Sequence, residues 1–560
     1  MEIQPKLLTI QEFLNGKLFR VPQYQRAYSW ESRQRKDLFE DIERVQSTHE
    51  DHFMATIVGL ERKGYEKQIG AHRFSIMEIV DGQQRLTTLI LLLKAIQKAL
   101  KSADKEEQRL QAELATLLVK DDEHTLLLLQ TNHDASGIFA DYIREGKIPR
   151  ADAPITADQN ILDAISECEQ FVDSWKKRSW SLIELTTVIR YRLSAVFHII
   201  SDEGLVYRVF EVLNSRGLEV ASLDKLKSQL MGRVFELNKN GDSRDIINDL
   251  HGIWAQIYRT IGRQRFGTET LRFAATLRAP AEESHKRPLG EQQALETLAK
   301  MAGHKHKSIV ACAKWLQTVV NAEARLLANY RWRAVTRIVQ ARLVAIATLV
   351  RNDFTEAEVS QLLGLWERVT FRIYGLGRGD KRTKVGDYTT LAWEIVNKNL
   401  SATEIESRLR ELGSGEYSIS QIIKDKDLSD FYNGWTEELR YFFYRYEEHL
   451  ARAAGEKLNE SEWNRIWAVE PAKSIEHIKP QSSGVAYMHH LGNLMMLPPG
   501  VNSSLKDSDP SKKANKYRKS GLRSSDEVAE IIKKNRGWSK PIVEDRASKL
   551  MKWAQSEWKD

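Results

Sequence analysis

Cysteine is scarce in this chain, which has two among its 560 residues, Cys168 and Cys312. They lie too far apart for a C-x-x-C pair, so the sequence argues against a structural zinc or redox site and favours a reducing compartment. Long apolar runs are also missing, because the longest, at 86–96, is interrupted by Lys94 before it could span a bilayer. With no signal-like pattern at its start, the sequence predicts a cytoplasmic protein that does not enter a membrane.

The chain also lacks the G-x-x-x-x-G-K-[ST] loop of Walker-type nucleotide-binding proteins, and it shows no internal repeat or low-complexity tract. Any nucleotide hydrolysis would therefore use a different kind of phosphate site. The composition, 42% hydrophobic and 29% charged, is typical of a folded chain, and the length predicts several domains.

Excess charge is absent from most of the sequence and concentrated at one end. Residues 471–560 contain 17 Lys and Arg against 10 Asp and Glu, whereas residues 1–470 are balanced, although the whole chain has a formal net charge of +7. A local basic excess suits binding to a phosphate backbone, and a solubilising tail is the alternative.

The distribution of apolar residues predicts an α+β, predominantly helical protein. Residues 1–100 mix β-rich runs at 52–61 and 74–82 with helical patterns. Residues 105–410 read as helical, including the stretch 182–200, with a loop expected at 375–387.

A motif at 78–89, EIVDGQQRLTTL, predicts a strand, a tight turn and a helix start. Such a turn presents backbone amides and the positive end of a helix to a phosphate. Asp81 would hold a metal ion or ribose and Arg85 a phosphate, and the whole turn forms the candidate nucleotide site: Asp81, Gly82, Gln83, Gln84 and Arg85. A solvated surface turn is the alternative.

Two further stretches have candidate residues for the same site. In FRVPQYQRAYSW (19–30), Gln25 and Arg26 lie between Tyr24 and Tyr28, so aromatic rings could hold a guanidinium toward a phosphate. In FEVLNSRGLEVASLDKLK (210–227), Asn214 and Arg216 end one helix before another begins. Taken singly, these stretches also fit a packed edge and a helix–loop–helix joint.

Together, and in this order, the three motifs resemble the N-terminal domain of GmrSD-type restriction enzymes across roughly residues 5–230. The resemblance implies a ParB/sulfiredoxin-like nucleotidase fold in which the D-G-Q-Q-R turn belongs to a nucleoside triphosphate site. GTP, ATP and CTP remain open as the nucleotide.

The stretch 474–513 predicts a strand, a second strand at 491–497, a loop from Val501 and a helix around 512–519. In a ββα-metal nuclease, a neutral histidine takes a proton from water beside a divalent ion. His477 is the candidate base, with Glu476 and Asn502 as ligands of Mg²⁺ or Mn²⁺ on the assumption that strand twist brings Glu476 and His477 to one pocket. Asn493 would brace the loop that presents the histidine, and Lys506 would neutralise the phosphate.

The basic run after this stretch is the candidate DNA-binding face: Lys512, Lys513, Lys516, Arg518 and Lys519. The segments E-H-I-x-P-Q, L-G-N-L and N-x-x-L-K together resemble the HNH-like C-terminal domain of GmrSD-type enzymes. Other HNH nucleases often have Asp where this chain has Glu476, so the resemblance supports His477 more firmly than Glu476.

Both resemblances together predict a nucleotide-binding domain at 1–230, a helical middle at 231–424 and a ββα-metal nuclease domain at 425–560. They imply a nucleotide-regulated, modification-dependent DNA endonuclease of anti-phage defence, with modified phage DNA and a nucleotide as partners and a homodimer left open. A nucleotide-dependent DNA-binding regulator without cleavage and an RNA-cleaving toxin are the alternatives.

Overall fold

The computed structural model describes most of residues 5–560. The segments outside the description are 23–24, 101–103, 121–126, 132–136, 148–155, 202–221, 238–243 and 265–267, together with the single positions 285, 426, 459 and 506.

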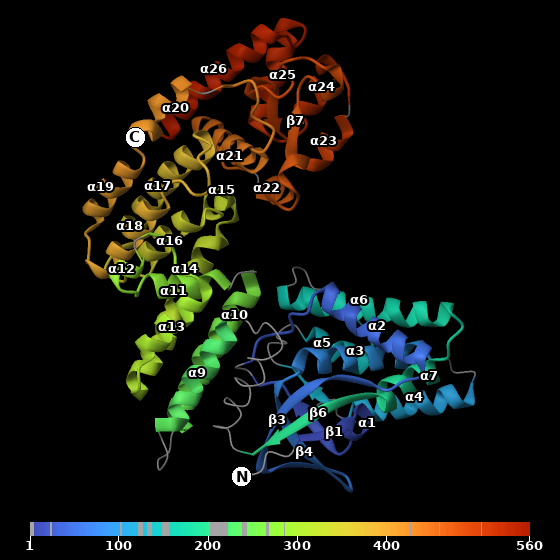
Figure 1. Ribbon diagram of the computed structural model, residues 1–560. Coiled ribbons are helices and arrows are strands. Elements are labelled where there is room, and N and C mark those ends of the chain that lie inside the picture. The colour runs from blue at the N-terminus through green and yellow to red at the C-terminus, as the bar shows by residue number, and fades with distance from the viewer. Residues whose placement is uncertain are drawn as a thin grey trace. The chain divides into compact units, whose positions relative to one another are not determined.

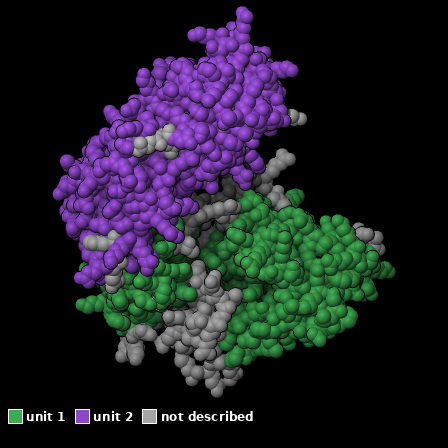
Figure 2. Space-filling model, turned by 45° about the horizontal axis from the view of Figure 1, so that its top comes forward, with its two compact units in different colours: residues 1–275, 290–324 green, residues 276–289, 325–560 purple. Residues whose placement is uncertain are grey.

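The chain divides into two compact units, coloured separately in Figure 2. The first comprises residues 1–275 and 290–324, and the second comprises 276–289 and 325–560. The chain therefore crosses between the units more than once near residues 276–324.

A mixed sheet of six strands forms the base of the first unit, in the order β1-β6-β3-β4-β2-β5. Parallel pairs join β6 to β3, β4 to β2 and β2 to β5, and antiparallel pairs join β1 to β6 and β3 to β4. The strands are β1 (Pro5–Thr9), β2 (Lys17–Arg20), β3 (His52–Ile69), β4 (His72–Asp81), β5 (Leu129–Gln130) and β6 (Leu193–Ile200).

The predicted β-rich runs at 52–61 and 74–82 correspond to β3 and β4, but the prediction of helix throughout 182–200 is wrong in its second half. The helix α7 (Leu182–Thr187) and a π-helical turn (Val188–Arg192) are followed by β6, which lies inside the sheet. Buried and partly buried residues alternate along most of β6, and this period of two is the strand signal that the apolar run concealed.

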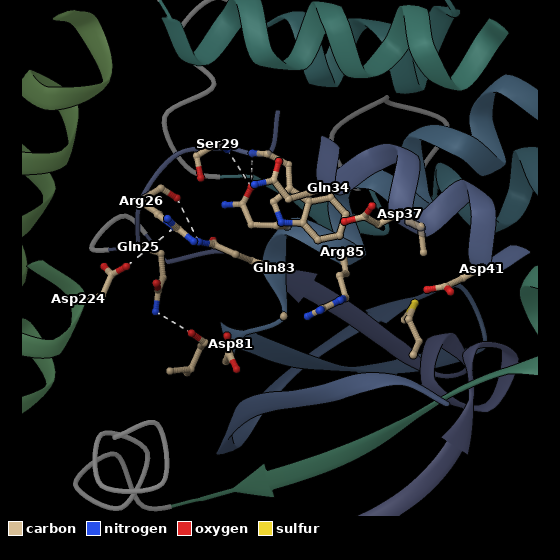
Figure 3. Close-up of a pocket in the computed structure, with 16 residues that line it drawn as sticks. Gln25, Arg26, Ser29, Gln34, Asp37, Asp41, Asp81, Gln83, Arg85 and Asp224 are labelled. Carbon is tan, nitrogen blue, oxygen red and sulfur yellow. Dashed lines mark hydrogen bonds and ion pairs between the residues drawn. The ribbon is translucent and has the colours of Figure 1, made fainter. Parts of the chain in front are cut away.

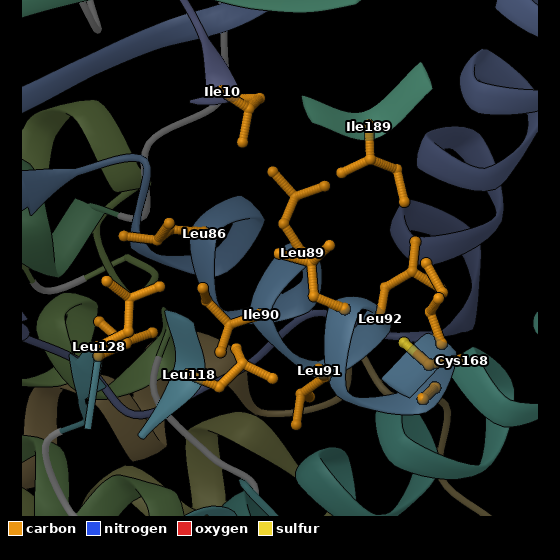
Figure 4. Close-up of a cluster of buried hydrophobic side chains, with 14 of the residues drawn as sticks. Ile10, Leu86, Leu89, Ile90, Leu91, Leu92, Leu118, Leu128, Cys168 and Ile189 are labelled. Atoms are coloured by element: carbon orange, nitrogen blue, oxygen red, sulfur yellow. The ribbon is translucent and has the colours of Figure 1, made fainter. Parts of the chain in front are cut away.

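Helices cover one face of this sheet (Figure 1), with α3 (Gln83–Ala99) at the centre of their core. Thirteen residues of α3 between Gln83 and Ile96 are buried, all but Arg85, and Figure 4 shows its leucines among side chains from other segments of the first unit. A helix apolar on all sides must be surrounded, and this burial fixes where its first turn lies. Neighbouring helices are α1 (Ile10–Leu14), α2 (Ser32–Thr48), α4 (Lys105–Leu118), α5 (Ile138–Glu145) and α6 (Thr156–Lys177).

The described residues in the rest of the first unit are mainly helical. They include α9, and Asp224 in the first turn of this helix lies beside the turn between β4 and α3. The helices are α9 (Ser222–Leu237), α10 (Arg244–Gln264), α11 (Thr268–Thr276), α13 (Glu291–Ala302) and α14 (His306–Ala328).

The second unit begins with a helical layer that leads into the predicted β-β-α segment. Its helices up to that segment are α12 (Ala281–Ser284), α15 (Arg333–Thr336), α16 (Val339–Leu349), α17 (Glu356–Thr370), α18 (Val385–Asn397), α19 (Ala402–Leu412), α20 (Ile419–Asp425), α21 (Thr436–Ala453) and α22 (Glu460–Trp467).

The predicted β-β-α order is present at the end of this unit. β7 (Ile475–His477) pairs antiparallel with β8 (Leu494–Met496), and α24 (Pro510–Tyr517) lies beyond them. Where a loop was expected from Val501, the chain forms a further helix, α23 (Pro499–Leu505), and the chain closes with α25 (Arg523–Asn535) and α26 (Lys540–Glu557). The Pro-Pro-Gly turn therefore starts a helix, as proline at a first helical position favours.

The architecture is α+β and predominantly helical, as predicted. Among the described residues, no helix combines the length and apolar character that crossing a bilayer requires.

Candidate functional site

The turn between β4 and α3 has the predicted strand, turn and helix start. Gly82 adopts a positive φ of 87°, and a Cβ there would lie 2.9 Å from Ile57 Cγ1. Only glycine fits both the left-handed backbone and this close approach, so Gly82 sets the direction in which α3 leaves the sheet.

A cavity of about 430 Å³ lies at this turn, and its size is in the range of small-molecule sites. The predicted residues that line it come from two separate segments of the chain: Gln25, Arg26, Asp81, Gly82, Gln83, Gln84 and Arg85. Asn214 and Arg216 lie outside the described residues, but Asp224, which comes after them on α9, also lines the cavity.

Three of the four glutamines that line the cavity, Gln25, Gln83 and Gln84, hold its wall together. Gln84 Oε1 accepts hydrogen bonds from the backbone N–H groups of Ser29 and Trp30, at 2.8 and 3.3 Å, and its amide donates to the carbonyl of Ala27. Gln83 donates to the carbonyl of Arg26, and Gln25 donates to the carbonyl of Val80. These buried amides fasten the segment 25–30 to the start of α3, so they shape the site from behind as well as lining it.

The charged groups of the cavity are mixed in sign. Arg26 Nε lies 3.9 Å from Asp224 Oδ2. Arg85 contacts an aromatic ring, with its guanidinium 5.7 Å from the centre of the Trp30 ring. Figure 3 shows Asp224 on one side of the cavity and Asp41 on the other, with Arg85 between them. Burial raises the pKa of Asp81 and lowers the pKa of Arg85.

Sequence reasoning missed part of the cavity wall. Gln34, Asp37, Leu38 and Asp41 all lie on α2 and line the cavity. Their spacing of three, four and seven residues places them on one helix face. The polar members, Gln34, Asp37 and Asp41, show this spacing in the sequence, but only the folded chain decides which space they face.

In the second unit, His477 is at the end of β7 and is 7% exposed. Its Nε2 lies 3.0 Å from His489 Nδ1, and the amide nitrogen of Gln481 lies 3.0 Å from its Nδ1. Tyr432 packs edge-on against His477 and stacks on His489. Burial, with His489 and Lys513 nearby, lowers the pKa of His477 to about 4, so its ring is neutral at neutral pH.

His489 is therefore a site residue that the sequence did not identify. Sequence reasoning favours a surface or packing role for it, and its position in the loop before β8 gives no hint of a contact with β7. In the folded chain this loop is held by backbone hydrogen bonds, because Phe431 N–H donates to the carbonyl of His489 and Asn493 N–H donates to that of His490.

Asn493 is fully buried, and its Oδ1 accepts hydrogen bonds from Lys479 N–H at 2.8 Å and Trp538 Nε1–H at 3.0 Å. Its amide donates to the carbonyls of Lys479 and Met488. The side chain of Asn493 therefore connects the residues just after His477 to the loop before β8, and its bracing role in catalysis stays a prediction.

The prediction that Glu476 shares a metal pocket with His477 is wrong. Successive side chains of a strand point to opposite faces, and the short strand β7 keeps that alternation. Glu476 points into the interior, where its Oε1 accepts hydrogen bonds from Lys513 Nζ at 2.7 Å and Tyr517 at 2.9 Å. Burial raises the pKa of Glu476 even with these donors present.

The same contacts correct the assignment of Lys513 to the DNA-binding face. Lys513 is 1% exposed and also donates to the carbonyls of His477 and Ile478. In α24 the spacing of four residues places Lys513 and Tyr517 on the buried face. The other members of the basic run are exposed or partly exposed: Lys512, Lys516, Arg518 and Lys519.

Of the remaining candidates, Asn502 lies at the start of α23, where its amide donates to the carbonyls of Lys473 and Ile475. These bonds connect α23 to β7. They leave the amide oxygen of Asn502 as the one side-chain atom of this residue that could bind a metal ion. Lys506 lies outside the described residues. No cluster of three or more His, Cys, Asp or Glu suited to a metal ion occurs in the described part of the chain.

Comparison with known proteins finds two matching family models. Residues 10–231 match the N-terminal domain of GmrSD restriction endonuclease, and residues 417–553 match the C-terminal domain of GmrSD restriction endonucleases. Together the matches cover more than half of the chain, and the cavity lies in the first and His477 in the second. Among curated proteins, no match is found.

Proposed function

Since the chain belongs to the GmrSD restriction endonucleases and is a restriction-type DNA endonuclease, we propose that it is regulated by a nucleoside triphosphate and cuts modified phage DNA. The N-terminal domain is a ParB/sulfiredoxin-like nucleotidase at 1–230, and the C-terminal domain is an HNH-like nuclease at 425–560. The helical middle, 231–424, lies between them in the sequence.

The observation that carries the nucleotide assignment is the cavity at the start of α3. It combines a helix N-terminus, two arginines and a turn that only glycine permits. Its four carboxylates, Asp37, Asp41, Asp81 and Asp224, would repel a bare triphosphate. The nucleotide therefore binds together with a divalent cation, which neutralises this charge, and GTP, ATP and CTP are all candidates.

In the nuclease domain, His477 acts as general base. Its pKa of about 4 keeps the ring able to accept a proton from an attacking water molecule. Tyr432 and His489 fix the plane of the ring, while Asn493 fixes the loop after it. Water exclusion is partial, because His477 remains slightly exposed.

Mg²⁺ or Mn²⁺ is the proposed cofactor of cleavage, where it would polarise the scissile phosphate. The predicted protein ligands fit it only in part. Asn502 retains an amide oxygen, but Glu476 is held by Lys513 and Tyr517 on the other face of β7. The roles of His477, His489, Tyr432 and Asn493 do not depend on the ion.

A cytoplasmic location is proposed from the substrate, since incoming phage DNA is met there. Lys512, Lys516, Arg518 and Lys519 are the proposed phosphate contacts next to the nuclease site. Nucleotide binding would control cleavage, and a homodimer remains a candidate assembly.

The decisive experiment challenges cells with phages whose genomes carry different base or backbone modifications. We expect the intact protein to restrict one class of modified phage and His477→Ala to restrict none. Purified protein should nick plasmid DNA only with Mg²⁺ or Mn²⁺, at a rate that changes with GTP, ATP or CTP. If the protein binds DNA but does not nick it, the result would support a nucleotide-dependent DNA-binding regulator. If it cleaves only RNA, the result would support an RNA-cleaving toxin.

A further inference from the structure

The loop at residues 377–384, between a π-helical turn (Phe371–Leu376) and α18, is strongly basic. Its sequence, GRGDKRTK, has four basic residues and one acidic residue. It belongs to the second unit but lies outside the segment that matches the C-terminal family domain, 417–553. The proposed activity by itself gives this loop no role.

The backbone of the loop is held from inside the protein. Gln340 on α16, which is 5% exposed, donates to the carbonyl of Lys381 at 2.8 Å and to that of Thr383 at 3.3 Å. The Tyr374 hydroxyl also donates to the carbonyl of Thr383. Asp380 accepts a hydrogen bond from the backbone N–H of Arg382. A loop fixed by buried donors presents its outward side chains in a defined arrangement.

Those outward side chains are Lys381 and Arg382. Both are exposed, and the structure records no ion pair for either among the residues it describes. Ordering two long cationic side chains near each other, with no carboxylate paired to them, leaves positive charge available to an anionic partner.

The loop is joined to the nuclease site by direct contacts. The guanidinium of Arg378 donates to the carbonyl of Asp430 and lies 5.3 Å from the centre of the Phe431 ring and 5.8 Å from that of Trp435. The next residue after Phe431, Tyr432, packs on His477 and His489.

The guanidinium of Arg378 therefore contacts the segment 430–435. This segment includes Tyr432, whose ring packs on His477. The contact of Arg378 anchors the start of the loop to this segment.

We propose that the loop 377–384 is a second DNA-contacting element of the nuclease, in which Lys381 and Arg382 bind backbone phosphates of the duplex that His477 cuts. The inference rests on the proposed DNA cleavage and extends the DNA-binding surface from α24 into the helical part of the second unit. Phosphate contacts of this kind position the duplex without reading its sequence.

The test measures binding of a fluorescent DNA duplex at several salt concentrations, in a His477→Ala background so that the DNA stays intact. K381E/R382E should weaken binding by roughly tenfold or more and reduce the slope of log affinity against log salt by about two, because each phosphate contact contributes about 0.9. K381Q/R382Q should give a smaller loss of the same kind.

The matched control is K552E/K559E, which makes the same change in charge at an exposed position of α26 and at one just after its end. Lys540 is the first residue of α26, and Lys552 lies twelve residues further on. The distance between them along the helix axis is about 18 Å. The control should bind as the parent does, and all variants should melt at the parent temperature.

A second measurement uses chains with His477 intact. There K381E/R382E should raise KM for DNA and leave kcat nearly unchanged, since the loop binds substrate and does not touch the reacting atoms.

If K381E/R382E binds DNA with the same affinity and the same salt slope as the parent, the inference is overturned. The endonuclease assignment then stays intact. An equal loss in the α26 control would also overturn it, because bulk charge would then explain the effect. A parent that neither binds nor nicks DNA would instead refute the proposed function, and the inference with it.

Discussion

The N-terminal cavity and the His477 site use their motif residues in opposite ways. At the cavity, five consecutive motif residues, 81–85, all line one wall. At β7, the adjacent residues Glu476 and His477 face opposite sides, and Glu476 is held in the interior. A helix start can present a contiguous motif to one space, whereas a strand separates neighbours.

The two sites also differ in how much of their motif is structural. In the nuclease domain, Asn493, Glu476, Lys513 and His477 are all buried and bonded within the protein. In the cavity, Asp81 and Arg85 are only partly buried, and the glutamines provide the support. A motif match therefore marks a site without saying which members touch a ligand.

The largest expected effect separates the two regions directly. His477→Ala should lower the DNA-cleavage rate by roughly 10²- to 10⁴-fold, because it removes the base. Nucleotide binding at the cavity should not change. Rates are measured by plasmid nicking and binding by calorimetry, and wild-type nicking in the variant would end the assignment of His477.

The reciprocal test is at the cavity. Asp81→Ala and Arg85→Ala should each abolish nucleotide hydrolysis, since each removes a charge that the triphosphate and its cation meet at the turn. Nicking measured without nucleotide should persist. Hydrolysis at the wild-type rate in both variants would show that the turn is structural.

Lys513 and Lys512 give a matched comparison within one helix. Lys513→Met should lower the free energy of unfolding by about 3–5 kcal/mol, because Glu476 is left as a buried carboxylate without its cation. Lys512→Met, at an exposed position, should change stability by less than about 0.5 kcal/mol and weaken DNA binding instead. Equal stabilities in denaturant titrations would contradict the buried pair.

Gln84→Ala tests whether the glutamines support the cavity. It leaves the backbone N–H groups of Ser29 and Trp30 without their acceptor and should cost about 1–3 kcal/mol of stability. Gln170→Ala, at an exposed position of α6, is the control and should be nearly neutral. Thermal melting distinguishes the two, and an unaffected Gln84 variant would argue for a ligand-binding role alone.

The last expected effect concerns pH. The pKa of His477 is about 4 in the folded protein against an ordinary value of 6.5, so the unfolded chain binds more protons between these values. The free energy of unfolding should therefore rise with pH through this window and level off above it, by up to about 3 kcal/mol for this group. His477→Ala should flatten that part of the stability profile, and an unchanged profile would place the histidine in a more hydrated environment.

Several features are determined by the sequence alone. The strand, turn and helix at 78–89 were predictable because an apolar strand, Asp-Gly and an apolar helix each have strong local preferences. The β-β-α order was predictable for the same reason, since a short strand, a Gly-Asn turn and a lysine-rich helix are locally encoded.

The tertiary structure decided the rest, because it depends on which face of an element is buried. Apolar content alone did not distinguish β6 from a helix, since both would be buried and only pairing with β1 and β3 selects the strand. Lys513 resembles its neighbours in a basic run, but helical rotation turns it toward Glu476. The cavity wall on α2, the contact of His489 with His477 and the anchoring of the basic loop through Arg378 all depend on contacts made by the folded chain, and no local pattern specifies such contacts.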